Sequence, residues 1–112
     1  MHTDGTIQDF VKEGLGLDGL VAYQEGSVVS RTVINKSAGT ITLFAFDKGQ
    51  SLSEHTAPFD ALVQVIDGRV EIRISGAPYV LKKGEIIIMP GGQPHAVTAL
   101  EKFKMMLVMI KQ

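Results

Sequence analysis

The chain has 112 residues and no cysteine, and its 11 Lys and Arg residues nearly balance its 12 Asp and Glu residues. This length is typical of one domain with its own core, and the balanced charge argues against the basic surface that nucleic-acid binding needs. Without cysteine there are no disulfides, thiolate zinc sites or cysteine nucleophiles, so a metal would have to be held by His, carboxylate or water.

Residues 1–19 are expected to form an N-terminal arm with a short helix. Thr6 and Asp9 suggest a helix cap, apolar residues follow at helical spacing, and Gly14 lies behind them. The early acidic residues and the lack of a continuous apolar stretch argue against a secretory signal. The longest apolar run, residues 105–110, is far shorter than the roughly 20 residues of a membrane span. We therefore expect a cytoplasmic protein with no membrane partner.

Residues 20–112 are expected to form an all-β barrel. Short β-rich runs, broken by turn residues, occupy 20–24, 27–35, 40–46, 61–66, 69–75, 78–82, 85–90, 95–100 and 102–110. So many runs at such close spacing predict a sandwich or a barrel.

The dipeptide Asp67-Gly68 lies between two of these runs. Asp-Gly between strand patterns favours a two-residue hairpin turn, which would pair Ile66 with Arg69. The sequence therefore predicts a hairpin at this point.

Strand alternation outward from this turn predicts which side chains face the interior. The apolar face comprises Ala61, Val63, Val65, Val70, Ile72 and Ile74. If the same register continues back through Pro58, then Ala57 and His55 also point inward.

Two patterns in the chain resemble the two motifs of the cupin family. Gly49, His55, Ala57, Ala61 and Gly68 have the spacing of the family's Gly, His, His, Glu and Gly. Gly84, Pro90, Gly92, His95 and Ala99 have the spacing of its Gly, Pro, Gly, His and Asn. The resemblance implies a jelly-roll barrel (a double-stranded β-helix), with residues 1–112 forming a single cupin domain.

The resemblance also implies a reduced metal site. In the family, three His and one Glu bind one metal ion; here His55 and His95 match, while Ala57 and Ala61 replace a His and the Glu. Two imidazoles are fewer than the three protein ligands usual for catalytic zinc or the two His and one carboxylate of non-haem iron. We expect His55 and His95 to bind a divalent metal (zinc, nickel, iron or manganese) weakly at best.

Alternatives remain for the residues around this site. Glu54 or Asp60 could supply a carboxylate, but both have the wrong strand parity and would need a bulge to reach the interior. Asp60 could instead cap backbone donors. Gln93 shares the parity of His95 and could reach the barrel mouth or belong to the turn alone. Either His could be a pocket-wall residue that is satisfied by water or a backbone carbonyl.

These residues favour a small-molecule pocket of unknown specificity. The predicted lining is His55, Ala57, Ala61, Val63, Gln93 and His95. One alternative is an enzyme: a metal-dependent oxygenase or isomerase that uses His55 and His95, or a metal-free isomerase in which one of them handles a proton. Another is a non-catalytic dimeric module.

The run at residues 102–110 is apolar on both faces, with Phe103, Met105, Leu107 and Met109 on one face and Met106, Val108 and Ile110 on the other. A surface strand of a lone barrel should alternate, so one face is expected to be covered by a partner. Together with the resemblance, this predicts a homodimer. The methionines of this run are interpreted as core or interface filling, with a soft-metal stripe as the alternative.

Overall fold

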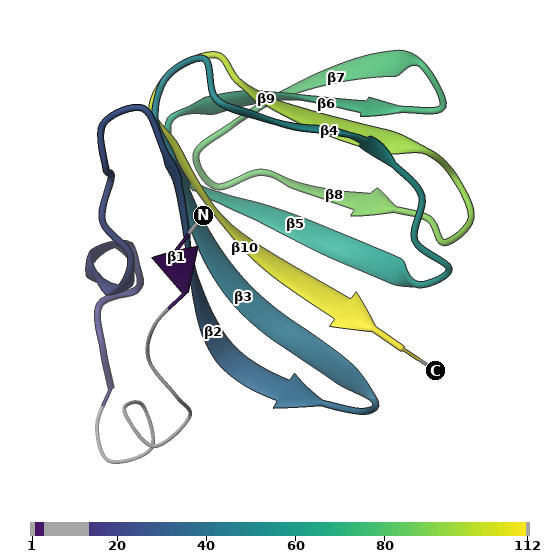
Figure 1. Ribbon diagram of the computed structural model, residues 1–112, viewed down its shortest axis with the longest axis horizontal. Coiled ribbons are helices and arrows are strands. Elements are labelled where there is room, and N and C mark those ends of the chain that lie inside the picture. Colours follow the sequence, from purple (N-terminus) through teal and green to yellow (C-terminus); the bar gives the residue numbers. More distant parts are fainter. Residues whose placement is uncertain (1, 4–13, 112) are drawn as a thin grey trace.

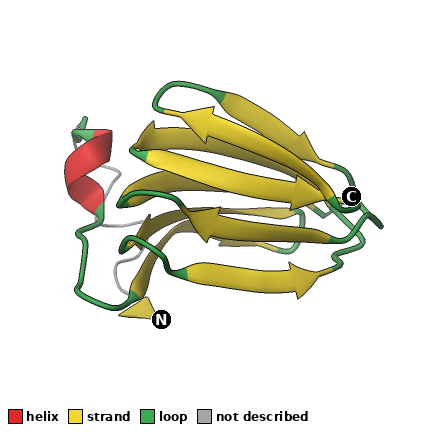
Figure 2. Ribbon diagram, turned by 90° about the horizontal axis from the view of Figure 1, so that it is seen from above, coloured by secondary structure: helices red, strands yellow, loops and turns green. Residues whose placement is uncertain are grey.

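The computed structural model describes residues 2–3 and 14–111, in which two β-sheets face each other (Figures 1 and 2). One sheet has the order β1-β2-β3-β10-β5-β8 and the other the order β4-β9-β6-β7. The strands are β1 (His2–Thr3), β2 (Val28–Lys36), β3 (Gly39–Phe46), β4 (Ser51–His55), β5 (Asp60–Asp67), β6 (Arg69–Ile74), β7 (Ala77–Lys82), β8 (Ile86–Met89), β9 (His95–Ala99) and β10 (Phe103–Ile110). The predicted all-β jelly roll is confirmed.

The structure differs from the predicted elements near the N-terminus and at β4. The expected strand at residues 20–24 is wrong: the 3-10 helix η2 (Leu17–Leu20) precedes an irregular segment. The helix expected from Thr6 lies outside the described residues. Strand β4 was not predicted, because Leu52 is its one apolar residue before His55. Among the described residues, no helix is long and apolar enough to cross a membrane.

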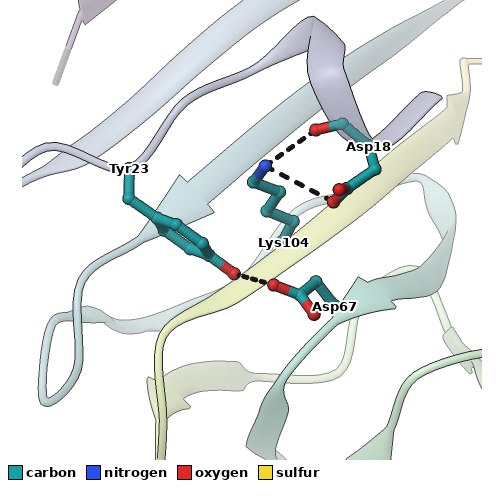
Figure 3. A network of polar contacts seen from close by, with 4 residues as sticks. All are labelled: Asp18, Tyr23, Asp67 and Lys104. Carbon is teal, nitrogen blue, oxygen red and sulfur yellow. Dashed lines mark hydrogen bonds and ion pairs between the residues drawn. The ribbon is translucent and has the colours of Figure 1, made fainter. Parts of the chain in front are cut away.

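Residues 17–23 lie against the outer face of the six-stranded sheet (Figure 3). Nζ of Lys104 on β10 donates to the carbonyl oxygen of Asp18 at 2.7 Å and lies 4.9 Å from the centre of the Tyr23 ring. The Tyr23 hydroxyl donates to Asp67, and burial together with this bond raises the pKa of Tyr23. Buried Val21 completes the contact by packing on Leu43, Ala45 and Ile66. The apolar character of residues 20–24 thus reflects packing on a sheet rather than pairing within one.

The predicted hairpin at Asp67-Gly68 is also wrong. Strands β5 and β6 lie in different sheets, and Arg69 pairs with Lys82 instead of Ile66. Gly68 is the corner where the chain crosses between sheets: its φ is +76°, and a Cβ there would collide with the carbonyl oxygen of Lys102. An Asp-Gly pair supplies positive φ equally well at a hairpin and at such a corner.

The predicted interior face is nevertheless confirmed. Val63, Val65, Val70 and Ile72 are all buried in one cluster between the sheets, together with Ala61. The predicted facing of these side chains was right although the predicted strand pairing was wrong. The corner at Gly68 directs the alternate apolar residues of β5 and of β6 into the space between the two sheets.

The two ends of this interior differ in the size of their side chains. Phe46 and Phe103, with ring centres 4.8 Å apart, fill the end near the Gly68 corner. At the opposite end, β5 begins with Asp60 and Ala61. The small Ala61 side chain leaves space in the interior that a larger side chain would fill. The cavity described below lies at this second end.

Candidate ligand-binding site

Two loops meet at the alanine-lined end of the barrel. Figure 1 shows that the β4–β5 and β8–β9 connections lie at the same end of the two sheets. The Gly92 N–H donates to the carbonyl oxygen of Ala57, and the Gly91 N–H donates to Oδ1 of Asp60, both at 2.8 Å. A Cβ on Gly91 would lie 2.7 Å from the carbonyl oxygen of Pro58. These contacts hold together the strand ends that carry the two histidines.

His55 and His95 face each other across the barrel mouth. They are direct partners in the β4–β9 ladder, and their Nε2 atoms are 3.1 Å apart. A bulge in β4 between Leu52 and His55 lets the side chains of these two residues both face inward, although an unbroken strand would direct them to opposite faces. The expected proximity of two histidines 40 residues apart is confirmed.

The other ring nitrogen of each histidine contacts a backbone carbonyl oxygen. Nδ1 of His55 lies 2.9 Å from the oxygen of Ser53, and Nδ1 of His95 lies 3.3 Å from that of Gln93. Because a carbonyl oxygen accepts and does not donate, these two contacts favour the tautomer with hydrogen on Nδ1, in which the Nε2 atom of each ring carries a lone pair. Two nitrogen lone pairs this close repel each other, and a proton or an electrophilic ligand held between them would remove that repulsion.

The two rings differ in burial. His55 is exposed at the mouth, whereas His95 is 5% exposed. Burial lowers the pKa of His95, and the nearby His55 lowers it further when charged, while the hydrogen bond to Gln93 opposes the shift. His95 is therefore neutral near pH 7, and its Nε2 is available as an acceptor or a ligand.

A cavity of about 40 Å³ lies beside the imidazole pair. Its walls are Leu52, His55, Ala57, Ala61, Met89, His95, Val97, Met105, Leu107 and Met109. This space suits roughly two or three waters and is much smaller than the roughly 300–1,000 Å³ of a typical drug-sized pocket. Apart from the two imidazoles, the wall is apolar.

The structure brings together four of the six residues expected at the pocket: His55, Ala57, Ala61 and His95. Val63 is buried in the core but does not line the cavity. Gln93 lies exposed on the turn before β9, where its side chain accepts a hydrogen bond from Ser75. The backbone of Gln93, rather than its side chain, serves the site by orienting His95.

Sequence reasoning did not place Met89, Met105 and Met109 at the cavity wall, although it offered a soft-metal stripe that includes Met105 and Met109 as an alternative. The alternation of residues 103–110 places Met105 and Met109 on one face. The missing information was that β10 and β8 both pair with β5 beside Ala61.

The two candidate carboxylates do not reach the cavity wall. Asp60 is exposed and accepts from Gly91, as expected for an Asp at the end of a loop, and Glu54 is exposed. In residues 14–111, no cluster of three or more His, Cys, Asp or Glu side chains could hold a metal ion.

The comparisons with known proteins identify the family. The family model described as "Cupin domain" matches residues 42–111, more than half of the chain, so this protein belongs to the cupin family. No match was found among curated proteins.

Several solved structures are similar. A conserved protein of unknown function from Streptococcus pyogenes is 38% identical with a TM-score of 0.87, over 90% of this chain and 89% of that one. A cupin superfamily protein from Desulfitobacterium hafniense is 25% identical with a TM-score of 0.86, over 90% and 93%. A cupin 2 conserved barrel domain protein from Leptotrichia buccalis is 43% identical with a TM-score of 0.84, over 87% of this chain and 47% of that one.

Proposed function

We propose that this cupin binds one small ligand at the paired imidazoles and does not hold a divalent metal tightly. The observation that carries the proposal is the pair of Nε2 atoms, 3.1 Å apart, at the wall of an otherwise apolar cavity. The lone pairs of these atoms accept a hydrogen bond from a ligand O–H or N–H, while Ala57 and Ala61 leave room beside them. Pockets that combine apolar walls with a few convergent polar groups are typical ligand sites.

The size of the cavity restricts the ligand. About 40 Å³ accommodates a few non-hydrogen atoms, so the ligand is much smaller than a nucleotide or a sugar, or it extends from the cavity past exposed His55 into solvent. A short apolar chain with one polar end satisfies both the walls and the imidazoles.

The geometry gives less support to a metal-dependent oxygenase or isomerase. Such a site needs a third protein ligand. Asp60 would have to leave its bond to Gly91 to supply one, and Glu54 would have to turn from solvent into the barrel.

The ligand proposal is tested with alcohols and carboxylic acids of one to three carbons as probes. We expect at least one probe to shift the Nε2 resonances of His55 and His95 saturably in ¹⁵N-detected NMR spectra. Ala61→Leu, which fills the cavity, should abolish the shift, and the matched control Gln64→Ala should retain it, since Gln64 lies on the opposite face of β5. The proposal fails if the probes leave both imidazoles unperturbed and native mass spectrometry finds no copurifying small species.

Metal content is measured separately. After dialysis against a mild chelator, the wild-type protein should retain much less than one equivalent of zinc, nickel, iron or manganese. Stoichiometric retention of any of these would contradict the reduced site and favour the metal-dependent enzyme.

A further inference from the structure

The cavity wall carries thioethers on both sides of Ala61, the position where the family pattern has a carboxylate. Ala61 on β5 pairs with Met89 on one neighbouring strand and with Met109 on the other. Directly paired residues of a sheet share a face, and all three side chains line the cavity. The space left by the missing Glu is thus flanked on both sides by methionine, with Met105 deeper on the same wall.

This donor set is chemically distinct from that of a hard divalent site. Two imidazole nitrogens and up to three thioether sulfurs are available, whereas carboxylates are missing from the cavity lining given above. Thioether and imidazole ligands suit Cu(I), whereas carboxylate and water suit magnesium, calcium and manganese. The composition of the wall therefore favours soft metal ions over hard ones.

Charge and geometry favour the same class of ion. The cost of transferring an ion into an apolar environment rises with the square of its charge, so a monovalent cation enters this wall at much less cost than a divalent one. Metal–nitrogen bonds of about 2.0–2.1 Å in a tetrahedral site separate two nitrogen ligands by about 3.3–3.4 Å. The observed 3.1 Å between the Nε2 atoms needs to open only slightly to reach that value.

We propose that the cavity binds a single cuprous ion through Nε2 of His55, Nε2 of His95 and the thioether of Met89, Met109 or both. The inference goes beyond the proposed function and rests on it in one respect: the same two Nε2 atoms are the binding atoms. The chain has no cysteine, so no thiolate elsewhere in it competes for a soft ion.

The test is an anaerobic titration of Cu(I) against a chromophoric cuprous chelator. His2, the chain's third histidine, is replaced by Ala in every sample to remove a competing imidazole. We expect one equivalent of Cu(I) to bind, and the double variant Met89→Leu/Met109→Leu to bind it at least about tenfold more weakly. Zn(II) binding, measured in parallel, should be unchanged by the double variant because the imidazoles remain. Leucine conserves volume, so the barrel should be retained.

Met106→Leu is the matched control. Met106 lies on the same strand as Met109 but packs against the outer cluster, so the variant should leave Cu(I) affinity unchanged. An equal loss in Met106→Leu, or no loss in the Met89/Met109 double variant, would overturn the inference.

A second measurement avoids substitution of the methionines. With ¹³C-methyl-labelled methionine and Ag(I) as a redox-inert substitute for Cu(I), the ε-methyl signals of Met89 or Met109 should shift with one equivalent, and that of Met106 should not. Unshifted Met89 and Met109 signals would overturn the assignment even if the leucine variants failed to fold. Organic probes that bind at the imidazoles while Cu(I) and Ag(I) do not would overturn this inference alone and leave the proposed function intact.

Discussion

At Ala57 and Ala61 two methyl groups replace the side chains that the family pattern uses to complete a metal site. Both residues line the cavity, so the backbone still directs these positions toward the imidazole pair. The difference between a hard metal site and this pocket is therefore local to two side chains.

The double variant Ala57→His/Ala61→Glu tests that conclusion. A third imidazole and a carboxylate should tighten Zn(II) binding by at least about a hundredfold, since changes even in outer-shell groups alter metal affinity 10–100-fold. Metal analysis after chelator dialysis should find about one equivalent in the variant and much less in the wild type. No gain in a folded variant would mean that positions 57 and 61 do not converge on the imidazoles closely enough to share an ion.

His95 should make the stability of the metal-free protein depend on pH. Burial keeps its pKa below the ordinary value of 6.5 in the folded state, so below pH 6.5 the unfolded chain takes up a proton that the folded chain resists. The free energy of unfolding should be highest above pH 6.5 and should fall as the pH drops through 6.5 toward the folded pKa. His55 is the titratable side chain that faces His95 in the described cavity wall; the other wall residues are apolar.

Urea unfolding between pH 7.5 and pH 5 measures this dependence. His95→Gln should show a smaller loss of stability over the same interval, because the residue that resists protonation is gone. A wild-type protein that becomes more stable than His95→Gln on acidification would contradict the assigned sign.

At the scale of elements, the close approach of the β4–β5 and β8–β9 loops positions the imidazole pair. Gly91 allows that approach, since a Cβ would lie 2.7 Å from the backbone of Pro58. The reason is lack of space rather than backbone conformation, because Gly91 does not have a positive φ.

Gly91→Ala should therefore destabilise the protein by about 1–3 kcal/mol, as overpacking does, and should push the two histidines apart. Urea unfolding gives the first quantity, and the Nε2 resonances in NMR spectra report the second. Gly19→Ala is the matched control, because nothing lies within 4 Å of a Cβ at that position. If the two variants behave alike, loop contact at Gly91 does not hold the site.

At the scale of the whole molecule, the outer face of the six-stranded sheet is covered over only part of its described area. Residues 17–23 cover the region around Leu43 and Met106. Farther along the same face, Ile88 is 50% exposed and Ile110 is 54% exposed. These two side chains border an open groove lined by Asp60, Ala61, Leu62, Ile88, Val108 and Ile110.

We propose that a second copy of the chain covers this groove, which gives the homodimer suggested by the sequence. The wild type should be dimeric by light scattering at micromolar concentration, and Ile88→Lys/Val108→Lys should be monomeric, since two charges cannot be buried unpaired against a partner. Thr98→Lys, on the exposed face of the other sheet, should remain dimeric. A monomeric wild type, or a dimer that tolerates both lysines, would remove the proposal. Met106 is a poor probe, because it packs against the chain's own N-terminal segment.

The sequence by itself determined the all-β class and the inward parity of residues 61–74, and its resemblance to the cupin motifs predicted that His55 and His95 converge. These conclusions rest on strand alternation and motif spacing, which are local properties. Alternation survives an error in pairing: Val65 and Val70 face inward whether Gly68 makes a hairpin or a crossing between sheets.

Only the tertiary structure decided which strands lie side by side, and with that the chemistry of the cavity. Met89 and Met109 are 20 residues apart, and they became neighbours of the imidazoles because β8 and β10 both pair with β5 at Ala61. The bulge that turns His55 inward and the packing of residues 17–23 on the outer sheet likewise depend on partners distant in sequence. Periodicity indicates which face a side chain occupies, but it carries no information on the neighbour that shares that face, because long-range pairing is selected by the packing of the whole barrel.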